Sequence, residues 1–430
     1  MYRKSCHDDE LPEIGLYFEG RLNPENRWVK MAKRLPWQEL EVDYTKHFKS
    51  CGRGEVALNV RVAMGALLIK EILGLSDRAV VDAVSENPYL QYFLGFKHFQ
   101  TEPPFNASLM THFRKRLPAE VINRFNEKVI ELARRPPPED DPSPDGGDKP
   151  APDKKEPEPA NAGTILMDAT CAPTDIKYPT DLNLVNDARE LTEQLIDQMR
   201  KQQANPSPRP RIRVIHLVHD QQREMLDRKS RRVEHRIVSL HQPHVRPIVR
   251  GKAGRETEFG AKLTASLENG YTRIERLSWE AYNEAADLQT ICERYKERNG
   301  HYPEAVLADK LFRNRENLRY CSEHGIRLSG PKLGRPTKVV DSDILRQQLA
   351  DNSARNAIEG KFGQCKRRFG LGRVMARRKD SSETVIAITI LTANLIRWEQ
   401  EAARLLFFVF PTICWESWRN ENIEIYRMAA

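Results

Sequence analysis

The feature that most constrains the fold of this 430-residue chain is one segment that contains no large apolar side chain. Residues 136–159 hold nine prolines and two glycines, together with eight acidic residues and three lysines. Such a segment cannot bury enough apolar surface to offset the entropy lost on ordering, so we expect a disordered, partly extended linker. The linker, at 135–161, predicts a boundary between a domain at 1–134 and a second domain at 162–410, which is followed by a tail at 411–430.

The rest of the chain is strongly basic. The whole sequence has a formal net charge of +8, of which the segment 136–159 contributes −5, and this leaves +13 for the remaining residues. An excess of this size favours a polyanionic partner, and nucleic acid fits that requirement best. A solvated basic surface with no such partner is the alternative.

The spacing of the cysteines and the lengths of the apolar stretches indicate the cellular compartment. The seven cysteines stand singly, none has the C-x2-C spacing of a zinc site, and no signal peptide precedes them, so reduced thiols in the cytoplasm are expected. The apolar stretch Leu405–Phe410 is followed by Pro411 and is far shorter than the ~20 residues of a membrane-spanning helix. We therefore expect no membrane association.

The first domain is predicted to be all-helical. Arg61–Leu75 is rich in alanine, leucine and isoleucine at helical spacing, and Ser76 is suited to cap the helix that follows. The connection Gly74-Leu75-Ser76 is compatible with a DNA-reading helix-turn-helix and with the far commoner hairpin of two helices. The residues leave both interpretations open.

The second domain is predicted to be α/β, with a mixed sheet covered by helices. Residues 164–173 and 245–251 have the pattern of strands, and residues 258–279 that of a hairpin with Asn269-Gly270 as its turn. Between the first and second strands, the segment 184–240 has apolar residues on one helical face and basic residues in its second half. It predicts a helical insertion after the first strand.

Two aspartates follow apolar runs at the ends of expected strands. Asp168 comes directly after Ile165-Leu166-Met167, and Asp309 directly after Val306-Leu307-Ala308. An unpaired buried charge is costly, and the ligands of such sheets bind at strand ends. On neighbouring strands the two carboxylates would bind a divalent cation through oxygen, as Mg²⁺ prefers. The alternative is that each aspartate caps the helix that follows it.

A third carboxylate belongs to a helical face. Asn352, Arg355, Glu359 and Lys366 stand at offsets 0, 3, 7 and 14, which places them within about 60° of arc on one helix. Glu359 can then join the two aspartates, with Arg355 and Lys366 beside it to hold phosphates. A solvated ion-pair face is the alternative, since an i, i+4 pair is worth only a few tenths of a kcal/mol. The stretch Lys361–Lys379, with eight cations and no acid, favours phosphate binding.

The order strand–Asp, strand–Asp, helix–Glu resembles the RNase H-like catalytic core of the DDE transposases of bacterial insertion sequences. The motif N-x2-R-x3-E-x6-K, which ends at Lys366, is similar to the Y-x2-R-x3-E-x6-K of that superfamily, with Asn352 in place of the tyrosine. Residues 246–263 and 313–336 are typical of one branch, and PYLQYFLGF with PPFNASLMTHFRKRL resembles its helical N-terminal domain. In a departure from many relatives, Asp309 is followed by Lys-Leu-Phe rather than by x-Gly-Tyr.

The resemblance implies a DNA transposase that cuts transposon ends and joins them to target DNA by metal-dependent phosphoryl transfer. It implies two Mg²⁺ ions, for which Mn²⁺ can substitute, held by Asp168, Asp309 and Glu359, with Asp168 bridging both. Lys366 and Arg355 would neutralise the charge on the transferring phosphate. The alternatives are a catalytically inactive DNA-binding relative, a plain RNase H-like nuclease, and a structural protein whose carboxylates are caps or ion pairs.

Double-stranded DNA, as transposon ends and as target, is the implied partner of a homodimer that works in the cytoplasm and at the nucleoid. Sequence recognition is expected from the N-terminal helices and the basic insertion, and most of the affinity from phosphates. The cations expected at the DNA are Arg228, Lys229, Arg231, Arg232, Arg250, Lys252, Lys361, Arg367 and Arg368.

Overall fold

The structure is a computed structural model that describes residues 22–46, 48, 57–135, 160–200, 209–252, 255–331 and 342–409. The predicted linker at 136–159 and the tail at 411–430 lie outside these residues. The chain forms two compact units. The first comprises the described parts of Met1–Met110, Arg124–Arg135 and Leu391–Ala430, and the second those of Thr111–Asn123 and Pro136–Ile390.

The described residues of the first unit form helices and connecting turns. Its most buried helix, α4 (Val60–Leu73), ends at Gly74, which is left-handed with a φ of 65°. Ser76 then caps α5 (Asp77–Glu86) by accepting a hydrogen bond from the backbone N–H of Ala79, as the sequence predicts. The other helices with residues in this unit are α2 (Arg27–Arg34), α3 (Trp37–Thr45), α6 (Pro88–Phe93), α7 (Leu109–Arg116), α8 (Ala119–Arg134) and α14 (Lys379–Val409).

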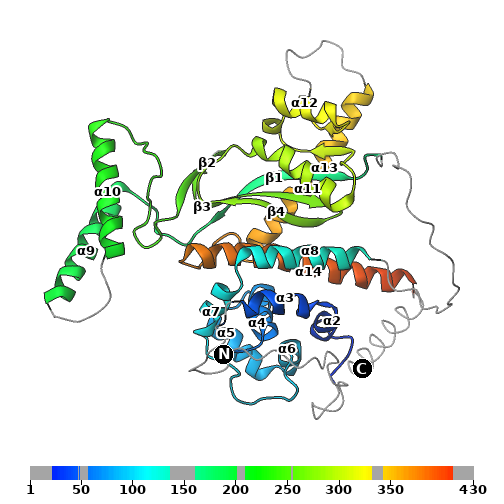
Figure 1. The fold of residues 1–430 in the computed structure, drawn as a ribbon, viewed down its shortest axis with the longest axis horizontal. Helices are drawn as coiled ribbons and strands as arrows, with labels where there is room; N and C mark the ends of the chain where they lie inside the picture. The colour runs from blue at the N-terminus through cyan, green and yellow to red at the C-terminus, as the bar shows by residue number, and fades with distance from the viewer. Residues whose placement is uncertain are drawn as a thin grey trace, which may run out of the picture. The chain divides into compact units, whose positions relative to one another are not determined.

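The second unit contains a mixed sheet whose six strands are β1 (Thr164–Pro173), β2 (Arg246–Lys252), β3 (Arg255–Glu268), β4 (Tyr271–Ser278), β5 (Ala305–Leu307) and β6 (Arg327–Leu328). β1 pairs antiparallel with β3 and parallel with β5, and β6 lies parallel to β5. β2 and β4 both pair antiparallel with β3 (Figure 1). The order β2-β3-β1-β5-β6, with β4 beside β3, confirms the predicted mixed sheet.

The hairpin of β3 and β4 turns at the dipeptide that the sequence predicts. Asn269 and Gly270 both have positive φ angles, 52° and 83°. Two consecutive left-handed residues are what a two-residue turn matching the twist of its strands requires, and asparagine followed by glycine adopts them most readily.

Helices cover both faces of this sheet, and they are α11 (Asp287–Asn299), α12 (Arg315–Glu323) and α13 (Ser342–Arg368). Residues of α11 and α12 pack around Met167 on one face. On the other face, Ile358 of α13 belongs to a cluster against which Leu166 of β1 packs. Because side chains alternate along a strand, Asp168 shares the face of Leu166 and lies on the side of α13.

The segment between β1 and β2 folds as a helical hairpin. Its helices, α9 (Asp181–Arg200) and α10 (Arg209–Asp227), lie beyond the strand ends, at the left of Figure 1. Leu184 and Val218 form a small core between them, together with Ile237 from the segment that follows. Nowhere in the described part of the chain is there a helix that combines the length and the apolar character needed to cross a membrane.

Candidate active site

Asp168 lies in the middle of β1 and not at its end, as the sequence pattern predicted, because β1 continues to Pro173. Asp309 does stand past the end of its strand, β5, which runs parallel to β1. The parallel register pairs Leu166 of β1 with Leu307 of β5. Continued by two residues, the same register brings Asp168 opposite Asp309, which stands just past the end of β5. The two aspartates therefore lie opposite each other just beyond the last residues that pair between β1 and β5.

Each of the two aspartates accepts a hydrogen bond from the backbone of the next residue. The N–H of Ala169 donates to Asp168 Oδ1 over 2.8 Å, and the N–H of Lys310 to Asp309 Oδ1 over 2.6 Å. Asp309 thereby caps the short 3-10 helix η2 (Lys310–Phe312), which is the capping alternative for this residue. The same oxygen also accepts from Arg355, so the cap does not remove Asp309 from the site.

Arg355 of α13 connects carboxylates from two different elements. Its Nη1 donates to Asp309 Oδ1 over 3.3 Å, and its Nη2 donates to Glu359 Oε1 over 2.8 Å. The side chain of Arg355 is 25% exposed, against 45% for Asp309 and 49% for Glu359. The guanidinium is therefore the more enclosed partner, and the two carboxylates reach it from the solvent side.

The charge of Arg355 also acts on Asp168. Burial raises the pKa of Asp168, and the negative charge of Glu359 adds to that shift, whereas the N–H of Ala169 and the charge of Arg355 oppose it. The hydrogen bond to Glu359, with the charges of Asp309 and Asp168, raises the pKa of Arg355. Three carboxylates and one guanidinium thus form a single electrostatic cluster.

This cluster fits a divalent cation by the chemistry of its donors. Carboxylate oxygens are the ligands that Mg²⁺ prefers, and one guanidinium leaves an excess of negative charge among three carboxylates. As the side chains stand, however, no three His, Cys, Asp or Glu side chains within the described residues are grouped so that they could hold a metal ion. Asp309 and Glu359 would have to exchange Arg355 for the ion.

The other residues of the predicted helix face continue along α13. Asn352 is exposed, and Lys366 is half-buried near the end of the helix. A Cβ at Gly372 would come within 2.7 Å of the carbonyl oxygen of Lys366, so glycine is required where the chain folds back on this helix. That close approach fixes the backbone from which the Lys366 side chain extends.

Three further predicted DNA contacts lie on α13. Lys361 is half-buried, whereas Arg367 and Arg368 are exposed. The guanidinium of Arg368 lies over the ring of Phe369, 5.4 Å from its centroid. A flat guanidinium on an aromatic ring is held in place while its N–H groups stay accessible to a phosphate.

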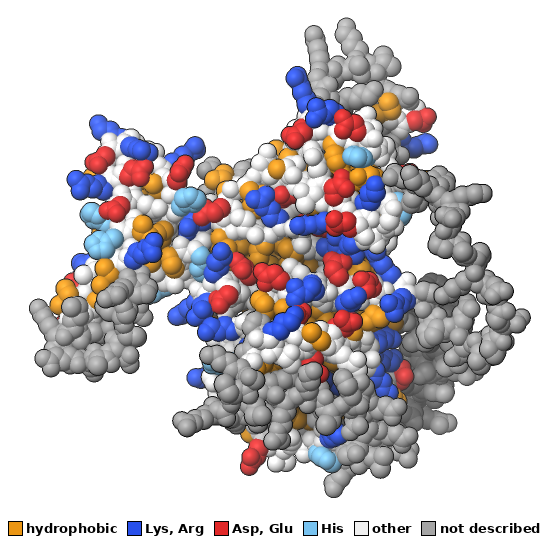
Figure 2. Space-filling view, viewed as in Figure 1, with side chains coloured by type: hydrophobic (Ala, Val, Ile, Leu, Met, Phe, Trp, Pro, Cys, Tyr) orange, Lys and Arg blue, Asp and Glu red, His pale blue; other side chains and the backbone are white. Residues whose placement is uncertain are grey.

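The predicted cations of the insertion differ in what they contact. Arg228 is paired with Glu224 over 2.7 Å, one helical turn earlier. Lys229 has a left-handed backbone with a φ of 48°, and Arg231 and Arg232 are exposed in the bend that follows α10. Figure 2 shows basic and acidic side chains mixed over this hairpin, so the insertion does not present one uniformly basic face on this side. The side chains of the remaining pair, Arg250 and Lys252, lie outside the described part of the structure.

The contact between Arg355 and Asp309 was not part of the sequence prediction. Helical spacing identifies the pair of Arg355 with Glu359, because these residues are one turn apart. Asp309 is 46 residues from Arg355 along the chain, and only the packing of α13 against the sheet brings the two together. No local sequence signal could have identified that contact.

Two family models match the chain. Residues 306–396 match the model described as the transposase DDE domain, and this stretch contains Asp309, Arg355, Glu359 and Lys366 but begins after Asp168. Residues 16–116 match a transposase domain described as DUF772, which corresponds to much of the helical first unit.

A curated relative adds a weaker similarity. It is an uncharacterized protein, ORF8 in the nfe locus of Rhizobium meliloti, and it is 29% identical over 163 residues. The alignment covers 38% of this chain and 69% of the relative. No solved structure matches the chain.

Proposed function

Because the chain belongs to the DDE transposases of bacterial insertion sequences, we propose that it cuts the ends of a mobile DNA element and joins them to target DNA. We further propose that Asp168, Asp309 and Glu359 are its catalytic carboxylates. The observation that carries the proposal is the cluster at Arg355. Carboxylates from the middle of β1, the end of β5 and one face of α13 act on a single guanidinium.

We also propose that the sheet is of the RNase H-like type. The support is its central β1, which has an antiparallel neighbour on one side and a parallel neighbour on the other, with Asp168 within β1 and Asp309 just past the end of β5. The third acid, Glu359, comes from α13, which packs on the face of the sheet that carries Asp168.

The three carboxylates would hold two Mg²⁺ ions, or Mn²⁺ in their place, and these ions supply activation of the attacking water or 3′-hydroxyl and stabilisation of the leaving oxygen. Arg355, once released from Asp309 and Glu359, offers a flat pair of donors that matches two oxygens of a phosphate. Lys366, farther along the same helix, would add positive charge where negative charge develops on the transferring phosphate.

Duplex DNA is the proposed partner, bound by a homodimer in the cytoplasm and at the nucleoid. The predicted contacts that are best placed to meet phosphates are exposed, namely Arg231, Arg232, Arg367 and Arg368. Arg228 is the weakest of the predicted contacts, because Glu224 already neutralises it.

The test is a gel assay with labelled DNA that carries the ends of the element, in Mg²⁺, which reports binding, nicking and joining in turn. Asp168→Asn, Asp309→Asn and Glu359→Gln should each abolish nicking and leave DNA affinity within several-fold, because metal ligation is lost and phosphate attraction is not. Glu323→Gln is the control, since this α12 carboxylate is 60% exposed and belongs to no site.

Three outcomes would overturn parts of the proposal. Nicking that survives Asp168→Asn but not Asp175→Asn would reassign the first carboxylate. Binding without any nicking by the unaltered protein would identify an inactive DNA-binding relative. Nicking without joining would leave a plain nuclease.

A further inference from the structure

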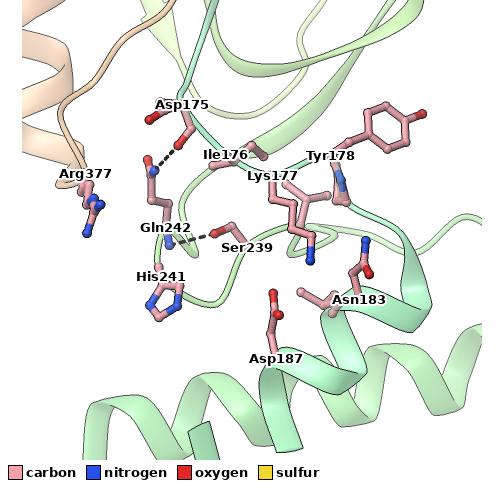
Figure 3. A pocket seen from close by; sticks show the side chains of 13 residues that line it. Asp175, Ile176, Lys177, Tyr178, Asn183, Asp187, Ser239, His241, Gln242 and Arg377 are labelled. Carbon is pink, nitrogen blue, oxygen red and sulfur yellow. Dashed lines mark hydrogen bonds between the residues drawn. The ribbon is translucent and has the colours of Figure 1, made fainter. Parts of the chain in front are cut away.

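A hollow of about 290 Å³ opens where the chain leaves β1 (Figure 3). Its walls come from four segments of the second unit: residues 175–179 after β1, the start of α9, residues 238–242, and Arg377. The wall is held in place by Gln242, whose side-chain amide donates to the carbonyl oxygen of Asp175 over 3.0 Å. A second hollow shares His241 and Arg377 with the first and continues to Arg378 and Lys379.

Most of the acids that line the two hollows are already engaged. Asp175 accepts from the guanidinium of Arg373 over 2.6 Å. Asp380 is paired with Arg378 over 3.2 Å, and Glu383 accepts from the indole N–H of Trp279 over 2.7 Å. The exception is Asp187 on α9, which has no partner within the described residues.

The cations of the hollows are in the opposite situation. Lys177, Arg377 and Lys379 have no ion-pair partner among the residues that the structure describes, and all three are exposed. Figure 3 shows the ammonium of Lys177 extending toward the wall formed by α9, and Arg377 at the opposite side. Because their charges are uncompensated at one hollowed surface, an anion can be held between them from two sides.

The beginning of α9 adds a second and independent attraction for an anion. Pro179, Asn183 and Leu184 line the hollow, so the amino end of this 20-residue helix faces it. The N–H of Asn183 already donates to Thr180 Oγ1 over 3.2 Å, so the attraction comes from the helix dipole, which makes the amino end of a helix favourable for negative charge. Asp181, the one acid in this first turn, is paired with Arg236 over 2.7 Å.

We propose that the two hollows bind a backbone phosphate of duplex DNA and anchor the duplex away from the point of cleavage. The proposal rests on the proposed function and adds a phosphate site that the predicted contacts do not include. Asp175 is seven residues past Asp168, which in an extended strand corresponds to roughly 20 Å. At 3.4 Å per base pair, the anchored phosphate lies about six base pairs from the scissile bond.

The test measures binding of the full-length protein to a labelled duplex that carries the element end, without Mg²⁺ and at several salt concentrations. The variant Lys177→Ala/Arg377→Ala should bind about tenfold more weakly at low salt. Its slope of log affinity against log salt should fall by about 0.9, the value for one phosphate contact. The matched control is Arg319→Ala on α12, because Arg319 is 76% exposed and lines neither hollow. It is compared with the single variant Arg377→Ala, which also removes one arginine.

The variant Asp187→Asn is expected to change DNA affinity in the opposite direction. If a phosphate binds beside this carboxylate, removing its charge should tighten DNA binding several-fold. If Asp187 instead stabilises the fold by attracting Lys177, the variant should lower the melting temperature and leave affinity unchanged or weaker, which overturns the proposal. The Lys177→Ala/Arg377→Ala variant is informative when its melting temperature matches that of the unaltered protein.

The position of the phosphate is tested with duplexes that carry one neutral methylphosphonate. Replacement about six nucleotides from the cleavage point should weaken binding of the unaltered protein and have no further effect on the Lys177→Ala/Arg377→Ala variant. An equal effect at every position would mean that the surface attracts DNA only diffusely. Protein that binds no duplex contradicts the proposed function itself, whereas binding with an unchanged salt slope contradicts only this site.

Discussion

Arg355 determines how the candidate active site can operate, since its two donors hold two of the three carboxylates. In this position Arg355 offsets the repulsion between the negative charges of the carboxylates. It also competes with any divalent ion for the same oxygens. If the three carboxylates hold Mg²⁺ as proposed, the arginine favours the fold of the metal-free protein and disfavours metal binding.

Arg355→Ala should therefore bind Mn²⁺ more tightly than the unaltered protein and cleave DNA more slowly. Loss of a partly exposed double ion pair corresponds to about 1 kcal/mol of competition, or roughly fivefold in metal affinity. Isothermal titration with Mn²⁺ measures the affinity without reference to activity. Arg367→Ala, an exposed cation on the same helix, is the control and should change metal affinity little. Weaker Mn²⁺ binding by Arg355→Ala would show that the arginine organises the ligands.

Asp168 carries a charge that its own surroundings disfavour. Burial raises its pKa, so the folded protein holds this proton more firmly than the unfolded chain does. The resulting contribution to stability is present at low pH and is lost as pH rises from the unfolded value through the folded one. At neutral pH the ionised carboxylate therefore destabilises the metal-free fold.

Asp168→Asn should accordingly raise the melting temperature of the metal-free protein at pH 7, by a few degrees, and abolish nicking. The gain should shrink as the pH falls, because the raised pKa lets the native carboxyl take up its proton at a higher pH than the unfolded chain does. Calorimetry at several pH values measures both effects. Asp351→Asn is the contrasting variant: Asp351 is a buried partner of Arg327 at 2.6 Å, and its loss should lower the melting temperature. A lower melting temperature in Asp168→Asn would mean that this carboxylate supports the fold.

At the scale of helices and strands, the segments that could be predicted are those in which burial imposes a pattern of apolar residues on the sequence. Apolar residues predominate in β1, most of which is buried, and its bounds match the predicted 164–173. The helix that carries the predicted face begins ten residues before Asn352, at Ser342. Its first two turns are exposed, although Leu345 and Leu349 stand four residues apart, so this helical spacing does not mark a buried face.

What the sequence could not supply is contact between distant segments. Asp168, Asp309 and Glu359 could be singled out because each has a local pattern, an apolar run or a helical spacing. The hollow at the end of β1 has no such pattern, since Lys177 and Arg377 are far apart in the chain and both look like ordinary surface cations. Only the return of the chain beside Thr174, where it pairs with Val374, brings those two regions together.

The insertion provides a prediction at this scale. Replacement of the four basic residues at its bend should weaken DNA binding and flatten the salt dependence, while cleavage of bound DNA changes little. Arg228, Arg231 and Arg232 are changed to Gln, and Lys229 to Asn, because asparagine tolerates its left-handed backbone. Arg228 is already paired with Glu224, so a second variant that retains Arg228 and changes the other three residues should lose nearly as much DNA affinity as the fourfold variant. An unchanged salt slope would remove the insertion from the DNA-binding surface.

At the scale of the whole molecule, residues from the two halves of the sequence fold together in the first unit. The first unit contains residues from before Met110 and also residues from Leu391 onwards. The side-chain amide of Asn394 donates to that of Asn126 over 2.8 Å, and both groups are buried. Leu395 and Trp398 lie beside Met31 and Leu35, and the guanidinium of Arg34 lies 6.0 Å from the ring centroid of Trp398.

A fragment that ends at Arg135 should therefore be unable to fold fully by itself, although it contains nearly all of the helices of the first unit. Without residues 391–409, Asn126 loses its buried partner and the apolar surface around Met31 stays exposed. We expect such a fragment to keep helical circular dichroism, to bind an apolar dye and to unfold without a sharp transition. A peptide of residues 388–409 added in trans should restore cooperative unfolding, and the same peptide with Leu395→Asp and Trp398→Ala should not. Cooperative unfolding of the fragment alone, at the temperature of the intact protein, would show that the C-terminal helix is dispensable for the first unit.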